Sequence, residues 1–113
     1  MSAFAITSTI EEQRAIVRCE GELDLETSAD ADSHLRKVED AEVSEIVLDL
    51  RMLEFMDSTG LRTILAADSR ARRDGRRLLL VRGPESVHRV FRIALLDQRL
   101  EFADPPGEGG PDV

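Results

Sequence analysis

The segment best suited to chemistry is Asp57-Ser58-Thr59-Gly60, which precedes an apolar helical stripe and follows the apolar pair Phe55-Met56, which we expect to be exposed. A hydroxyl next to a carboxylate can serve as a nucleophile or as a phosphate acceptor. The same residue types also begin helices, because an Asp or Ser side chain accepts hydrogen bonds from free N–H groups of the first turn. Neither Asp57 nor Ser58 is followed three residues later by Glu or Gln, so the capping box is incomplete. From this local pattern alone, a helix cap is the simpler interpretation.

An enzyme would need Ser58 as its nucleophile and His34 or His88 as the general base. The sequence has no Gly-x-Ser-x-Gly elbow, no Gly-x-x-x-x-Gly-Lys loop and no Gly-x-Gly-x-x-Gly. We expect both histidines at the surface or at the rim of the core, away from any catalytic geometry. The sequence therefore predicts that the protein is not an enzyme.

Metal and cofactor sites also find little support in the composition. The two histidines lack paired spacing, and Cys19 is the only cysteine, so neither a metal cluster nor an internal disulfide is expected. Cys19 alternates with Ala15 and Val17 in a predicted strand, which indicates a small buried hydrophobic residue rather than a reactive thiol. We predict no cofactor.

The charge balance bears on the partners. A net charge of -8 repels polyanions, so a basic partner protein suits this chain better than a nucleic acid does. Five arginines cluster late in the second predicted helix and after it, where the helix dipole favours cations. A solvated helix end is the simpler interpretation, and the cluster can also help to orient a partner. They are Arg70, Arg72, Arg73, Arg76 and Arg77. We predict no direct nucleic-acid partner.

The start of the chain carries no targeting signal that we recognise. Met1-Ser2-Ala3-Phe4 lacks a basic start followed by an apolar run, and no stretch reaches the roughly 18 apolar residues of a membrane span. We therefore expect a cytoplasmic protein.

Changes in hydrophobic period predict the order β-β-α-β-α-β-α. The expected elements are two alternating strands at 4–10 and 14–20 joined by a hairpin, a helix over 26–39, a strand over 46–50, a helix over 58–73, a strand over 78–81, a helix opening at Gly83-Pro84, and an edge strand or packed terminus at 100–102. The apolar run at 78–81 favours a strand that is covered on both faces.

This order predicts a single α/β domain over residues 1–103. Strands separated by helices must run parallel, so the sheet is mixed and mostly parallel, with an antiparallel N-terminal hairpin. Residues 104–113 are acidic and rich in Pro and Gly, which predicts a disordered tail. Sites in such sheets gather at the carboxyl ends of the strands, here in the expected loops 21–27 and 51–60.

Four segments together resemble STAS domains of the anti-sigma factor antagonist family. The third strand and the segment after it carry Ile46-Val47-Leu48-Asp49-Leu50 and Phe55-Met56-Asp57-Ser58-Thr59-Gly60-Leu61. The first loop carries Gly21-Glu22-Leu23-Asp24-Leu25, and the last helix carries Arg89-Val90-Phe91-Arg92-Ile93 up to Leu96-Asp97. The resemblance extends from about Phe4 to Phe102.

This resemblance implies a phosphorylation switch at Ser58. In the family, the unmodified antagonist binds an anti-sigma factor, a serine kinase with a GHKL-type ATPase fold, which then releases its sigma factor. Phosphorylation of the serine ends the binding, and a metal-dependent serine/threonine phosphatase restores it. The resemblance makes Asp24, Asp57, Thr59, Gly60 and Leu61 the partner-binding switch loop. A phosphate at a helix N-terminus is expected to find free N–H donors there.

Several readings stay open beside this one. STAS domains also serve as stress-signalling scaffolds and as parts of lipid-transport complexes, and a fold does not fix a function. Thr59 is a competing hydroxyl, although its β-branched side chain one residue into the helix favours a structural role. Gly60 either lets a kinase come close or fits the start of the helix. Leu95 stands where the family often has Gly, which questions the tight end of the last helix.

Overall fold

A computed structural model describes residues 3–103 of the chain, and the predicted tail at 104–113 lies outside them. The elements are β1 (Phe4–Glu11), β2 (Arg14–Leu23), α1 (Ser28–Glu39), β3 (Glu45–Met56), α2 (Ser58–Arg73), β4 (Arg77–Val81), α3 (Glu85–Ile93) and β5 (Phe102–Ala103). The predicted order is confirmed, and the short edge strand near residue 102 is present as β5.

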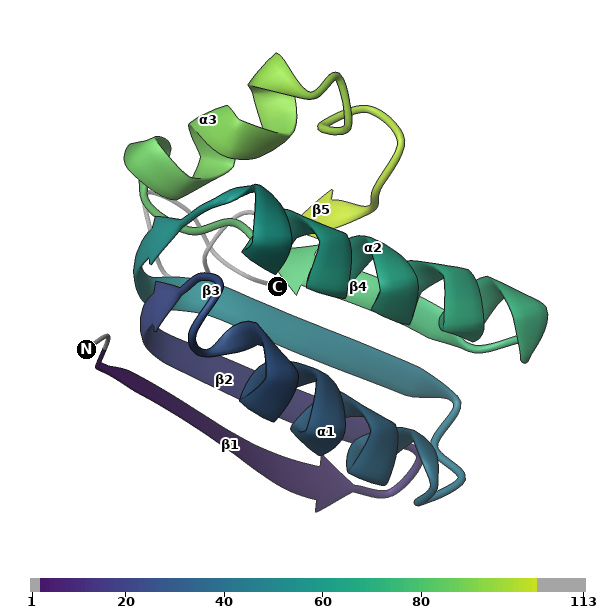
Figure 1. The fold of residues 1–113 in the computed structure, drawn as a ribbon. Helices are drawn as coiled ribbons and strands as arrows, with labels where there is room; N and C mark the ends of the chain where they lie inside the picture. The colour runs from purple at the N-terminus through teal and green to yellow at the C-terminus, as the bar shows by residue number, and fades with distance from the viewer. Residues whose placement is uncertain (1–2, 104–113) are drawn as a thin grey trace, which may run out of the picture.

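One sheet runs in the order β1-β2-β3-β4-β5. β1 is antiparallel to β2, whereas the other neighbours are all parallel, so the mixed α/β sheet with an N-terminal hairpin is confirmed. The hairpin turns at Glu12, whose φ of 58° lies in the left-handed region. The carboxyl ends of β2 and β3 meet at the left edge of the sheet in Figure 1.

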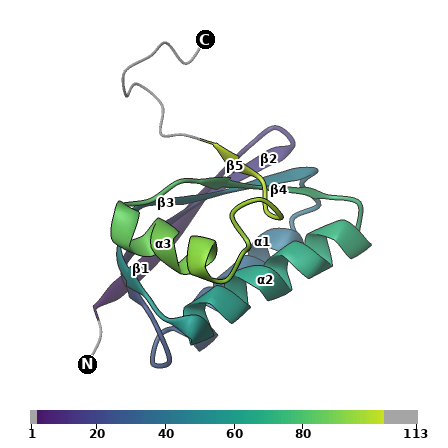
Figure 2. The ribbon, with the colours of Figure 1, turned by 90° about the horizontal axis from the view of Figure 1, so that it is seen from above.

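All three helices cover the same face of the sheet (Figure 2). Alternating strand residues face this layer, and the core consists of them together with one stripe from each helix. Ala31, Leu35 and Val38 form the stripe of α1, as the sequence predicts. The run at 78–81 was expected to be covered on both faces. That expectation is wrong for Leu79, which alternates away from the helices and stays partly exposed.

β3 is longer than its sequence pattern indicated. The prediction ended the strand at Leu50, but it continues to Met56 alongside the last residues of β2. Two register shifts interrupt this pairing, and they leave Leu50, Leu53 and Met56 buried at intervals of three rather than two. The irregular spacing hides the strand from a search for alternation. The predicted loop at 51–60 therefore shrinks to a single residue between strand and helix.

Helix α3 has a tight end, although Leu95 occupies the position where the family often has glycine. Leu95 takes a φ of 61°, and the N–H of Leu96 donates to the carbonyl of Phe91 at 2.8 Å. This is the closing hydrogen bond of a tight helix end, for which glycine is the usual residue. The tight end is thus present, at the cost of a left-handed leucine.

Replacing Leu95 with glycine should stabilise the protein. The left-handed conformation destabilises a residue with a side chain by about 1–2 kcal/mol, and glycine removes this strain. Part of the gain, about 0.5–1 kcal/mol, is lost because glycine gives the unfolded chain more conformational entropy. The side chain is exposed, so little packing is lost. We expect Leu95→Gly to raise the free energy of unfolding by about 0.5–1 kcal/mol in urea denaturation. Leu95→Ala removes the side chain but keeps the strain, and an equal gain in that variant would contradict the explanation.

Candidate functional site

Asp57 caps α2 and sets the position of Ser58. Its backbone is extended, and one carboxylate oxygen accepts from the N–H groups of Thr59 at 2.9 Å and Gly60 at 3.0 Å. The carbonyl of Asp57 accepts from the N–H of Leu61 at 3.0 Å. The cap predicted from the local pattern is therefore present. It leaves Ser58 exposed as the first residue of the helix.

Hydrogen bonds also fix the conformation of the segment after β2. The buried hydroxyl of Thr27 accepts from the N–H of Asp24 at 2.9 Å and donates to the carbonyl of Glu22 at 2.8 Å. The carboxylate of Asp24 accepts from the N–H of Glu26 at 3.0 Å. These bonds form a closed turn, so α1 begins at Ser28 rather than at Glu26 as predicted.

The two segments meet at one pair of residues. Leu23 is opposite Met56 in the parallel register, and the N–H of Asp57 donates to the carbonyl of Leu23 at 3.3 Å. Asp24 and Asp57 therefore each follow directly from paired positions of neighbouring strands. The sheet brings together the two loops that the sequence singled out, at the carboxyl edge where sites are expected.

Gly60 and Leu61 point into the protein. A Cβ atom at Gly60 would lie 2.5 Å from the carbonyl oxygen of Leu23 and 2.8 Å from its Cγ atom. Leu61 is buried in the core. Of the two readings of Gly60, the structure supports the fit of the helix start, because no side chain can be placed at this contact.

Thr59 and Ser58 differ in exposure. Ser58 is exposed, whereas Thr59 is half-buried and its carbonyl accepts from the hydroxyl of Thr63 at 3.2 Å. Ser58 is thus the hydroxyl that a second protein can reach more easily.

Large apolar side chains are exposed on both segments. Leu25 is 75% exposed beside Asp24, and Phe55 is 49% exposed three residues before Ser58. The sequence predicted that both Phe55 and Met56 are exposed, which is wrong for Met56 because it is buried in the core, and it overlooked Leu25. Its signal was available, since a leucine in a predicted polar turn has no core to enter.

A family model described as the STAS domain matches residues 5–107. The chain belongs to the STAS domain family. The family expected from the loop motifs is thereby confirmed.

Solved structures share the fold of this STAS domain. An anti-sigma factor antagonist from Mycobacterium paratuberculosis is 19% identical, with a TM-score of 0.81 over 88% of this chain and 85% of that one. The anti-sigma factor antagonist SpoIIAA in its unphosphorylated form is 22% identical, with a TM-score of 0.78 over 92% and 90%. The Bacillus cell fate determinant SpoIIAA in its phosphorylated form is 21% identical, with a TM-score of 0.71 over 94% of both chains.

The histidines of the STAS domain form no hydrogen bond to Ser58 within residues 3–103. His34 lies 3.0 Å from the hydroxyl of Ser8 at the surface. His88 was expected at the surface or rim of the core, and that expectation is wrong, since only 4% of it is exposed. Its ring packs against Phe91 and Phe102, because β5 closes over α3 and covers it. Cys19 is buried as predicted, and burial raises the pKa of its thiol to about 12.

His88 should make stability depend on pH. Burial lowers its pKa below the ordinary 6.5, and the cations Arg82 and Arg92 act in the same direction, against Asp97 and Glu85. Below pH 6.5 this histidine is therefore protonated more readily in the unfolded chain than in the folded one, so the free energy of unfolding falls as the pH drops through this range. We expect His88→Leu to lose less stability between pH 7.5 and pH 5.5 than the wild type, measured by urea denaturation. A parallel slope in both proteins would contradict this.

All five arginines of the predicted cluster form hydrogen bonds or ion pairs within the domain. Arg70 was expected at a solvated helix end, which is wrong, because it is buried and donates to both carboxylate oxygens of Glu39 at 2.8 and 3.0 Å. Arg76 donates to the carbonyls of Val43 and Glu39. The packing of α1 beside α2 explains this difference. Arg72, Arg73 and Arg77 remain exposed in ion pairs.

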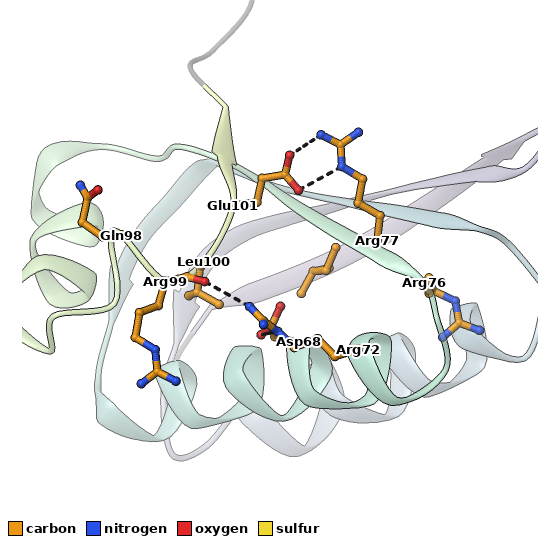
Figure 3. Close-up of a pocket in the computed structure, with 9 residues that line it drawn as sticks. Asp68, Arg72, Arg76, Arg77, Gln98, Arg99, Leu100 and Glu101 are labelled. Carbon is orange, nitrogen blue, oxygen red and sulfur yellow. Dashed lines mark hydrogen bonds and ion pairs between the residues drawn. The ribbon is translucent and has the colours of Figure 1, made fainter.

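A pocket of about 390 Å³ lies at the far end of α2 (Figure 3). Its polar lining contains four arginines, two carboxylates and one glutamine, but no serine, histidine or cysteine. Asp68 and Arg72 are 10 and 14 residues beyond Ser58, a helical distance of roughly 15–20 Å. The pocket is thus separate from Ser58 and offers no nucleophile–base pair. Residues 3–103 also hold no cluster of metal ligands and no helix long and apolar enough to cross a membrane.

Removing the cap at Asp57 should weaken the domain without unfolding it. Asp57→Ala loses both hydrogen bonds to the first turn, for an expected cost of about 0.5–2 kcal/mol. Asp57→Asn retains an oxygen acceptor and should lose much less. Urea denaturation measures both, with the m-value as the test that two-state folding persists. Equal losses in the two variants would show that charge, rather than hydrogen bonding, makes the cap.

Proposed function

We propose that this STAS domain is an anti-sigma factor antagonist whose unphosphorylated form binds an anti-sigma factor serine kinase of the GHKL type. Binding frees the sigma factor, and phosphorylation of Ser58 ends it. The observation that carries the proposal is the exposed Ser58 hydroxyl at the start of α2, at the edge where two acidic loops meet. The likeness in fold to anti-sigma factor antagonists, among them a phosphorylated form, supports it.

The cap at Asp57 determines which groups surround a phosphate on Ser58. Sequence reasoning expected free N–H donors for the phosphate, but Asp57 already occupies those of Thr59 and Gly60. A phosphate on Ser58 would add about -1.5 to -2 charges beside the carboxylate of Asp57. The favourable helix dipole keeps the domain folded, while the charge stays available to a partner.

The added charge is sufficient to end binding without a change of fold. A charge left unpaired in a desolvated interface costs about 2–5 kcal/mol. Because each 1.4 kcal/mol is tenfold in affinity, the expected loss is about 30-fold to a few thousand-fold. Release therefore requires only that Ser58 lies within the contact surface.

The remaining roles belong to other proteins. The chain offers Ser58 as a substrate and performs no catalysis of its own, which agrees with the lack of a base bonded to Ser58 within residues 3–103. A metal-dependent serine/threonine phosphatase would reset the switch. The proposed partners act in the cytoplasm, and the proposal requires this protein to act there too.

Variants of Ser58 test the switch. Ser58→Ala should fold and bind the kinase at least as tightly as the wild type, because it cannot be phosphorylated. Ser58→Asp should fold, since a negative charge suits a helix N-terminus, and should bind more weakly. Incubation with the kinase and ATP, followed by mass spectrometry and affinity measurement, checks each variant.

Thr59→Ala is the matched control, because it removes the neighbouring hydroxyl and should leave phosphorylation intact. Phosphate on Thr59 instead of Ser58 would refute the assignment of the site. Equal kinase affinity of the phosphorylated and unmodified forms would refute the mechanism. Capture of a transport complex or a signalling scaffold instead of a kinase would favour the other STAS roles.

A further inference from the structure

Two of the large exposed apolar residues flank the candidate phosphorylation site. Leu25 is two residues beyond Leu23, and Phe55 is one residue before Met56. Because Leu23 and Met56 are paired, the two exposed side chains belong to segments in direct contact. Ser58 follows Met56 by two residues and begins α2 at the same edge.

The backbone holds both apolar residues in place. Leu25 lies within the turn closed by the Thr27 hydroxyl and the Asp24 carboxylate. Phe55 is opposite Glu22 in the sheet and alternates with the buried Met56, so its side chain lies on the face away from the helices. The backbone that carries both residues is already ordered, so binding costs little backbone entropy.

Carboxylates surround this pair. Glu22, Asp24 and Glu26 stand on the first segment, while Glu54 and Asp57 stand on the second. Among these the structure gives no ion pair to a basic side chain of residues 3–103 for Glu22, Glu26 or Glu54. An apolar centre with an acidic rim is complementary to an apolar cleft that is bordered by Lys or Arg.

We propose that Leu25 and Phe55 are the apolar anchors that hold the partner kinase, in a cleft of the kinase with a basic border. The proposal rests on the proposed function and adds to it the residues that provide affinity. A few buried aromatic or aliphatic anchors near the centre of an interface usually supply most of its binding energy. Among the residues that the resemblance assigns to the contact, Gly60 has no side chain and Leu61 is buried, so neither supplies this affinity.

The anchors also explain why a phosphate at Ser58 acts strongly. A partner seated on both residues would span the carboxyl edge of the sheet, from which Ser58 begins α2. A phosphate there has to lose its hydration beside an apolar contact, and the carboxylate of Asp57 repels it.

Single substitutions of the anchors test the proposal. The probe is the purified kinase that phosphorylates Ser58, and the measurement is its dissociation constant for unphosphorylated variants. Leu25→Ser and Phe55→Ser should each weaken binding about tenfold or more, as expected for anchor residues. Thermal denaturation checks folding, which should hardly change because both side chains already face water.

Ile10→Ser is the matched control. Ile10 is 51% exposed, close to the 49% of Phe55, but lies in the hairpin at the opposite end of β2. It should bind within about twofold of the wild type. Anchor variants that bind less than about threefold more weakly, or an Ile10→Ser variant that is equally impaired, would overturn the proposal.

Salt concentration tests the basic border. The association rate of the wild type should fall as NaCl is raised, because complementary charges steer the encounter. An association rate that does not depend on the salt concentration would overturn the proposal of a basic border. If the wild type is neither bound nor phosphorylated, the proposed function fails; if it is both and the anchor variants bind normally, only the anchors fail.

Discussion

The close approach of the first turn of α2 to the end of β2 is the contact on which the candidate site depends. A side chain at Gly60 would collide with the carbonyl oxygen of Leu23, which also accepts from the N–H of Asp57. Only glycine lets the helix start at this depth. The contact fixes Ser58 against the neighbouring loop, and Asp57 then holds the first turn by its carboxylate.

A second set of contacts keeps the far end of α2 in place. Arg70 ties α2 to Glu39 at the end of α1, and Arg76 reaches the carbonyls of Glu39 and Val43. On the open face of the sheet, Glu45 pairs with Arg14 and Arg77. Positive charge is thus used internally at the end of the sheet away from Ser58, while acidic residues dominate the edge that Ser58 occupies.

The sequence predicted those parts of the fold that have a regular period. The bounds of α2 were predicted correctly, because its apolar stripe lies between a capping residue and the Asp74-Gly75 stop. β3 was cut short because its register shifts break the alternation after Leu50. His88 was misplaced because Phe102 of β5 packs against its ring, a contact between segments 14 residues apart that a local stripe cannot show.

The candidate site likewise combines features that local sequence patterns predict with features that depend on strand pairing. Asp57 as a cap and Ser58 as an exposed hydroxyl follow from local chemistry, which short-range patterns record. The inward direction of Gly60 depends on how two strands pair, and no single segment contains that information. Three residues assigned to one loop by motif therefore play different physical roles: Asp57 orders the turn, Gly60 permits the contact, and Ser58 is exposed to solvent.

The rigidity of this edge determines what kind of switch it can support. Both segments are closed by hydrogen bonds. A phosphate therefore acts, under the proposed function, on the contact surface without reorganising a loose segment. Under the proposed function, one surface is both the substrate of the kinase and its binding partner. Phosphorylation then converts a tightly bound substrate into a weakly bound product, and phosphoryl transfer from ATP to the Ser58 hydroxyl drives the release. The domain needs only one hydroxyl, held rigidly within an interface that cannot accept its charged form.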